Sequence, residues 1–163
     1  MSATLCDWLR GGGAAVTGAA GHGGGAVDAL VARAAQRAPT PIALPAPPSL
    51  GVCVVTCMDA RIRLFELLGL RYGEAHLVRT AGALPTPAVL DAIAISQGKG
   101  GTREVMVIHH TDCVALGQLA PGQDPADTVA DAVARIRADH RIPHRDQVRG
   151  FVLDLATGTL SET

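Results

Sequence analysis

Aromatic side chains are nearly absent from this chain of 163 residues, which holds one Trp, one Tyr and two Phe, or 2% of the total. Proteins that bind single-stranded nucleic acid commonly stack bases on aromatic rings, so this scarcity argues against such a platform. An excess of one charge is also missing, because 14 basic residues stand against 15 acidic ones and no Lys/Arg cluster forms a stripe. We therefore expect no nucleic acid partner.

Long apolar runs are missing too. None approaches the roughly 18 residues that a membrane-spanning helix requires, so we expect no membrane association. The first residues show no basic segment followed by an apolar one, so no secretory signal is expected and a cytoplasmic location is predicted. The cysteines are too few for a disulfide scaffold of this size, which favours metal binding or catalysis for some of them: Cys6, Cys53, Cys57 and Cys113.

The chain divides by composition into three segments. Residues 1–25 are rich in Gly and Ala and are expected to be flexible. Residues 26–49 are predicted to form a helix, over 26–37, followed by an extended arm that holds five prolines. Residues 50–163 are predicted to form the main folded domain.

From residue 50 onward, short β-branched runs alternate with helical patterns. The strand over 51–57 precedes a helical pattern over 60–70, in which Ile62, Phe65 and Leu68 share one face. Further strands are expected over 74–82, 105–108 and from 148, and further helices from Pro87 and over 124–140, the latter capped by Asp124 or Asp127. This alternation predicts an α/β fold with a mainly parallel β-sheet flanked by helices.

Two of these strands end in unusual groups. Cys57, Asp59 and Arg61 follow the first strand, and His110 begins an H-x-x-C that ends at Cys113. Functional groups of parallel sheets gather beyond the carboxyl ends of the strands. Two thiolates and one imidazole suit Zn²⁺, which prefers four tetrahedral ligands, so the fourth position would be open to water or to Asp59.

Simpler interpretations exist for each part of this pattern. Cys57 at a buried strand end is compatible with an ordinary core cysteine, since free cysteine is among the most buried residue types. An H-x-x-C alone is a weak signal. The combination is stronger, because both groups end apolar strands of the same predicted sheet.

The two motifs, C-x-D-x-R at 57–61 and H-x-x-C at 110–113, resemble the signature of the β-class carbonic anhydrases. The resemblance covers roughly residues 50–160 and includes "VRTAGA", which is similar to the family's R-N-A-G-G segment. It implies that residues 50–163 form a zinc-binding α/β catalytic domain with the family's fold, which would catalyse the reversible hydration of CO2 to bicarbonate by zinc-bound hydroxide. It also implies a homodimer or a larger homo-oligomer.

The resemblance further implies a role for each matching residue. Cys57, His110 and Cys113 would ligate zinc, while Asp59 and Arg61 would form a dyad beside it. A carboxylate there can accept a hydrogen bond from the reacting water, and Arg61 keeps that carboxylate ionised and directed away from the metal. If the pair broke, Asp59 could become the fourth zinc ligand.

Four more residues are candidates for the substrate pocket: His76, Thr80, Gly82 and Val114. His76 resembles a family position near the pocket, although a structural role fits it equally well. Thr80 replaces the family's Asn, and Val114 replaces a Gly after the last cysteine, where a β-branched side chain would crowd the substrate. His109 should point to the opposite face of its strand from His110, as a packing or supporting residue.

Three functions therefore stay open. The first is CO2 hydration. The second is a zinc hydrolase of the same family that acts on another small electrophile, such as CS2, COS or a biosynthetic intermediate, as the changes at Thr80 and Val114 suggest. The third is a non-catalytic subunit that zinc stabilises, with Asp59 closing the site.

Overall fold

The computed structural model describes residues 24–36 and 43–163. The predicted flexibility of residues 1–25 falls almost entirely outside these residues. The chain divides into two units, 1–42 and 43–163. In the first, the predicted helix is present as α2, Ala26–Ala35, and its apolar side chains Val27, Leu30 and Val31 are exposed.

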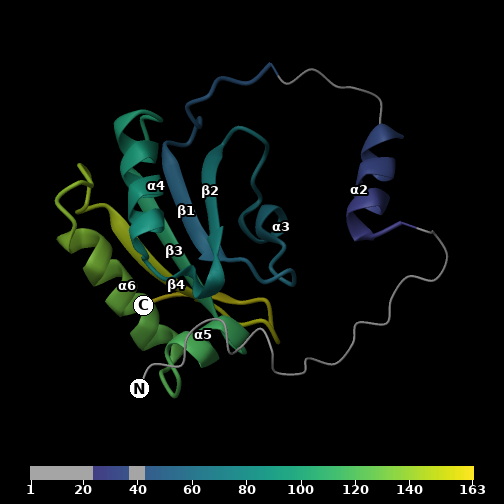
Figure 1. The fold of residues 1–163 in the computed structure, drawn as a ribbon. Helices are drawn as coiled ribbons and strands as arrows, with labels where there is room; N and C mark the ends of the chain where they lie inside the picture. Colours follow the sequence, from purple (N-terminus) through teal and green to yellow (C-terminus); the bar gives the residue numbers. More distant parts are fainter. Residues whose placement is uncertain (1–23, 37–42) are drawn as a thin grey trace. The chain divides into compact units, whose positions relative to one another are not determined.

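The second unit contains a five-stranded sheet with the order β2-β1-β3-β4-β5 (Figure 1). The strands are β1 Val52–Cys57, β2 Ala75–Thr80, β3 Glu104–His110, β4 Val148–Leu153 and β5 Leu160–Glu162. The first four are parallel, and only β5 runs antiparallel to its neighbour β4. The predicted α/β fold with a mainly parallel sheet is confirmed.

Helices cover both faces of this sheet. On one face, α4 (Pro87–Gly98) and α6 (Pro125–Ala138) bury Ile93 and Ile136 against Val55 and Val107. On the other, α3 (Leu64–Leu68) buries Leu64 against Val54 and Ile108. The starts of the long helices follow their sequence signals, because Thr86 and Asp124 cap α4 and α6 and a proline follows each cap.

The segment after β1 differs from its prediction. The helical pattern over 60–70 forms a helix only at Leu64–Leu68, because a turn comes first, in which the Ile62 amide donates to the Asp59 carbonyl oxygen. Ile62 therefore lies before the helix, and Phe65 is 39% exposed instead of sharing a buried face with it. Three short elements were not predicted: the 3-10 helix η1 (Ala81–Ala83), α5 (Val114–Leu119) and the edge strand β5.

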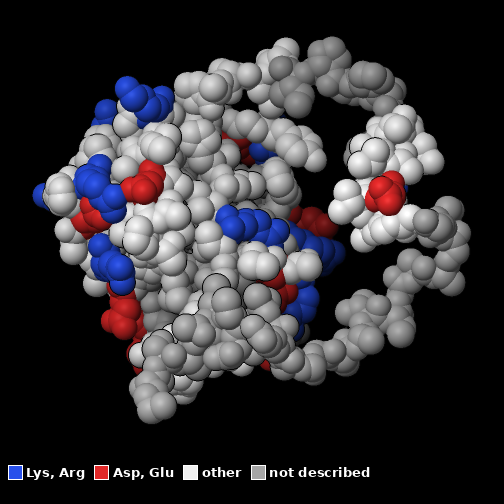
Figure 2. Space-filling model, in the orientation of Figure 1, with Lys and Arg blue, Asp and Glu red and all other residues white. Residues whose placement is uncertain are grey.

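Basic and acidic side chains are interspersed on the surface that Figure 2 shows. Among residues 24–36 and 43–163, no helix has the length and apolar character needed to cross a bilayer.

Candidate metal centre

Three predicted ligands meet where β1 and β3 end. These strands are adjacent and parallel, with Thr56 opposite Ile108, so Cys57 and His110 reach the same edge of the sheet. Cys113 follows three residues after His110 and caps the start of α5. The candidate ligand atoms of Cys57, His110 and Cys113 all lie within 4.8 Å of one another.

His110 presents its Nε2 atom for a ligand. Its Nδ1 lies 2.8 Å from the carbonyl oxygen of Thr111. Because a carbonyl oxygen only accepts, Nδ1 carries the proton in this contact and Nε2 keeps its lone pair. Nε2 is buried and has no hydrogen-bond partner among the described residues. A buried acceptor of this kind is costly unless something binds it, and a metal ion would do so.

The two thiols are close enough to share one cation. The Sγ atoms of Cys57 and Cys113 are 3.8 Å apart. Burial raises the pKa of the Cys113 thiol, the Leu116 amide that donates to its sulfur lowers it, and the neighbouring Cys57 raises it. A divalent cation between the sulfurs would favour both thiolates. The donor set of two cysteines and one histidine therefore fits Zn²⁺.

Asp59 and Arg61 form a close ion pair beside these candidate ligands. Nε and Nη2 of Arg61 donate to Oδ1 and Oδ2 of Asp59 at 3.0 and 2.8 Å, and the Arg61 amide donates to Oδ1 at 2.9 Å. These hydrogen bonds lower the pKa of the Asp59 carboxyl to about 2. The carboxylate is therefore ionised at neutral pH, and its direction is set by Arg61.

Arg61 also binds a second carboxylate that the sequence did not single out. Its Nη1 donates to Oδ2 of Asp112 at 2.7 Å, and its Nη2 donates to the Asp112 carbonyl oxygen at 2.9 Å. Asp112 lies between the candidate ligands His110 and Cys113 in the sequence. Asp112 occupies one of the two unspecified positions of the H-x-x-C motif. The motif therefore shows that it lies close to His110 and Cys113 in the sequence, but assigns it no role.

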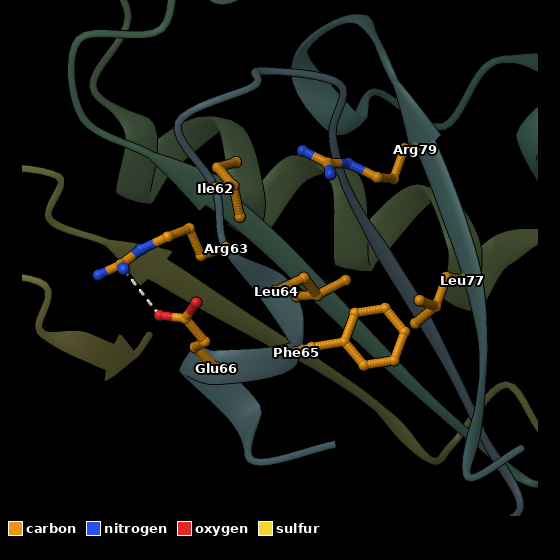
Figure 3. A pocket seen from close by; sticks show the side chains of 7 residues that line it. All are labelled: Ile62, Arg63, Leu64, Phe65, Glu66, Leu77 and Arg79. Atoms are coloured by element: carbon orange, nitrogen blue, oxygen red, sulfur yellow. Dashed lines mark ion pairs between the residues drawn. The ribbon is translucent and has the colours of Figure 1, made fainter. Parts of the chain in front are cut away.

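Arg79 holds the turn that follows Cys57. Its Nε donates to the Cys57 carbonyl oxygen at 3.0 Å, and its Nη2 donates to that of Asp59 at 2.6 Å. Arg79 belongs to the segment "VRTAGA", but no role was assigned to it from the sequence. Figure 3 shows it at one side of a groove of about 310 Å³ between α3 and β2, whose apolar wall includes Leu64, Phe65 and Leu77.

The candidate pocket residues Thr80, Gly82 and Val114 lie in three different environments. Thr80 ends β2 opposite Cys57, and its buried Oγ1 has no partner among the described residues. Gly82 packs on α5, where an added Cβ would lie 3.0 Å from Leu116 Cδ2. Val114 begins α5, and its side chain is 62% exposed.

The structure does not bring His76 to the centre. It pairs with Cys53 near the amino ends of the strands, four positions before the pairing of Thr80 with Cys57. At about 3.3 Å per residue, His76 is therefore roughly 13 Å from this edge. Its ring contacts Ser96 Oγ at 2.8 Å and the carbonyl oxygen of Ala46. Its role here is structural, and the suggestion that it lies near the pocket is wrong.

His109 points away from the centre, as predicted. It is fully buried on the α6 side, where its Nδ1 lies 3.0 Å from Thr128 Oγ1. Burial lowers its pKa to about 4, so it is neutral at physiological pH.

Three comparisons with known proteins agree with this geometry. The carbonic anhydrase family model matches residues 52–159. Beta-carbonic anhydrase 1 of Mycobacterium tuberculosis is 37% identical over 139 residues, which cover 73% of this chain and 85% of that protein. Carbon disulfide hydrolase of Saccharolobus solfataricus is 40% identical over 60 residues, or 37% of this chain and 29% of that protein.

Solved structures show the same similarity. The crystal structure of carbonic anhydrase from Streptococcus mutans superposes with a TM-score of 0.69 and is 30% identical. The match covers 83% of this chain and 93% of that one. The carbonic anhydrase from Glaciozyma antarctica gives a TM-score of 0.66 and 31% identity, over 84% of this chain and 93% of that one.

Proposed function

This chain belongs to the β-carbonic anhydrase family, and from that premise we propose that it is a zinc enzyme that interconverts CO2 and bicarbonate. One observation carries the proposal. The ligand atoms of Cys57, His110 and Cys113 lie within 4.8 Å of one another at the carboxyl ends of β1 and β3, with the ionised Asp59 beside them.

We propose these three residues as the zinc ligands. When bound, Zn²⁺ acts as a Lewis acid that lowers the pKa of a coordinated water molecule and makes it a better nucleophile. Two thiolates donate more charge to the ion than neutral imidazoles would, which weakens that effect. Groups on the protein that act directly on the reacting water are therefore more important here.

Asp59 is the group that we assign to the reacting water. Its carboxylate only accepts hydrogen bonds when ionised, so it can accept one from the water and turn an oxygen lone pair toward CO2. Arg61 supports this role in two ways. It keeps the pKa of Asp59 near 2, and its three contacts from Nε, Nη2 and the amide fix the direction of the carboxylate.

A second candidate substrate class is CS2 or COS. The local identity to carbon disulfide hydrolases, 40% over 60 residues, favours it, as does Thr80. The chemistry asked of Cys57, Asp59 and Arg61 is the same, since each of these linear molecules has an electrophilic carbon that is doubly bonded to two oxygen or sulfur atoms. Val114 supports this alternative less than expected, because its side chain is exposed.

We also propose a homodimer in the cytoplasm. The family resemblance supports the dimer, and so does the sheet edge at β2, which exposes 37% of Leu77 beside the partly exposed Phe65. The four cysteines are too few for a disulfide scaffold of this size, which fits a reducing compartment. Light scattering on purified protein and fractionation of the source cells would test the two statements.

Stopped-flow CO2 hydration with zinc-loaded protein tests the main proposal. We expect turnover well above the buffer rate, and a loss of about 100-fold or more in Asp59→Asn, because a neutral amide cannot orient the water as an ionised acceptor does. Parallel assays with CS2 and COS decide between the substrate classes. Zinc-loaded protein that turns over none of the three would support a non-catalytic, zinc-stabilised subunit.

A further inference from the structure

Asp112 and Asp59 share one guanidinium group. Arg61 gives Nε and Nη2 to Asp59, and gives Nη1 and a second Nη2 contact to Asp112. Contacts at both ends of a planar guanidinium prevent it from turning about its own axis, which contacts with Asp59 alone would restrain less. Arg61 thus holds the Asp59 carboxylate, and Asp112, in the turn after β3, holds Arg61.

The backbone of Asp112 suits this task. Its φ is +52°, a left-handed conformation that Asp, Asn and Gly adopt far more readily than other residues. In this conformation the Asp112 side chain and carbonyl oxygen both reach Arg61. The same turn returns the chain toward β1, so that Cys113 comes within 3.8 Å of Cys57.

A second site in the chain has nearly the same geometry and no metal ligands. Arg141 donates through Nε and Nη2 to Asp139, at 2.9 and 2.7 Å, and its amide donates to Asp139 Oδ1 at 2.9 Å. Its Nη1 pairs with Asp91 of α4. Among the described residues, only Cys57, His110 and Cys113 form a group that could hold a metal. The Asp-x-Arg arrangement is therefore a local structure that forms without a metal site. Whether it has a function depends on the residues around it.

The two sites differ at the second carboxylate. Asp91 contacts Arg141 through its side chain, whereas Asp112 also offers its carbonyl oxygen and lies between two candidate ligands. The Arg61–Asp112 pair is exposed, with 79% of the Asp112 side chain accessible, so its contribution to folding is small. The pair thus adds little stability, but it fixes Arg61 and with it the Asp59 carboxylate. A role in positioning that carboxylate explains the pair better than a role in folding does.

We propose that Asp112 is a positioning residue for the reaction, which acts by locking Arg61 and thereby the direction of the Asp59 carboxylate. This inference rests on the proposed function for its effect on turnover. The proposed role of Asp112 involves no contact with the substrate. The rotation of the Arg61 guanidinium reports on this positioning directly, and it can be measured without substrate and without activity.

Asp112→Gly is the decisive variant, since Gly accepts the positive φ and keeps the carbonyl contact while it removes the carboxylate. In the zinc-loaded enzyme we expect kcat to fall about tenfold with KM nearly unchanged, as is typical when a supporting group around a metal site is lost. Asp112→Asn should recover most of this loss, because its amide oxygen can accept the same hydrogen bond. Asp91→Ala is the matched control and should keep wild-type kcat.

NMR of the arginine side chains tests the same idea without an assay. In wild-type protein, the contacts of Nη1 and Nη2 should slow the rotation of the Arg61 guanidinium, and Asp112→Gly should speed the exchange between their signals. Unchanged exchange would overturn the inference, as would wild-type kcat in an active Asp112→Gly enzyme. If wild-type protein turns over no substrate but the exchange quickens, the proposed function fails while the positioning of Arg61 by Asp112 stands.

Discussion

The Sγ atoms of Cys57 and Cys113 lie 3.8 Å apart, although 56 positions separate the two residues in the chain. The parallel pairing of β1 with β3 brings the strand ends together, and the left-handed turn at Asp112 directs Cys113 back toward Cys57. Two thiolates at this distance would repel each other strongly without a cation between them. The arrangement is thus suited to hold a metal ion.

Cys57→Ser should abolish stable zinc binding. A serine hydroxyl is a poor zinc ligand at neutral pH, and the remaining His110 and Cys113 would leave the ion with too few donors. After dialysis we expect wild-type protein to retain about one zinc per chain and the variant less than about a tenth of that, by elemental analysis.

Cys53→Ala is the matched control, because Cys53 is buried at the other end of the same strand. It should keep its zinc even if it loses some stability. Retention of zinc by Cys57→Ser would contradict the assignment of the ligands.

Val114→Gly tests whether the residue after the last ligand restricts the substrate. Because the Val114 side chain is 62% exposed, we expect kcat/KM for CO2 to change by less than about threefold. Glycine at the start of α5 should lower the free energy of unfolding by only about 0.3 kcal/mol, because the helix propensities of Val and Gly differ little. A large rise in CO2 turnover would instead show that Val114 restricts the site, for example where a second copy of the chain covers it.

The sequence was sufficient to predict the parallel sheet. It was also sufficient to predict that the polar residues at the ends of β1 and β3 lie close together. Buried strands such as 52–57 have continuous apolar runs, and the rule that parallel strands end at one edge brings Cys57 to His110. It also predicted that His109 would face away, since side chains alternate along a strand.

The errors arose where tertiary contacts decide the outcome. The pattern over 60–70 predicts one helix, but the Asp59 side chain accepts a hydrogen bond from the Arg61 amide and forms a turn first. His76 was placed near the pocket by resemblance, whereas its register opposite Cys53 puts it at the other end of the sheet. The role of Asp112 depends on a contact across 51 positions, which no local pattern contains.

Gly82→Ala should destabilise the protein through two separate effects. Gly82 has a φ of +66°, a conformation that is strained for alanine, and its new Cβ would lie 3.0 Å from Leu116 Cδ2. We expect a loss of about 2–3 kcal/mol in the free energy of unfolding, measured by urea denaturation.

Gly158→Ala isolates the first of these effects. Its φ of +76° is similar, but its added Cβ would meet nothing within 4 Å. We expect this variant to lose only about 1 kcal/mol. Equal losses in the two variants would show that the close approach of Gly82 to Leu116 has no energetic cost.

The Asp139–Arg141 pair should make stability depend on pH in the acid range. Hydrogen bonds from Arg141 hold the pKa of the Asp139 carboxyl well below its ordinary value. A group with a lowered pKa in the folded state stabilises the fold above its unfolded pKa, near 3.9, and loses this contribution as the pH falls further. Asp139→Asn should therefore lower Tm at pH 6, and the gap to wild-type protein should narrow progressively below about pH 4. Comparison at each pH separates this effect from any loss of metal in acid, which both proteins share. A gap that stays constant from pH 6 to about pH 2.5 would contradict the assignment, since it would mean that Asp139 acts through its shape and not its charge.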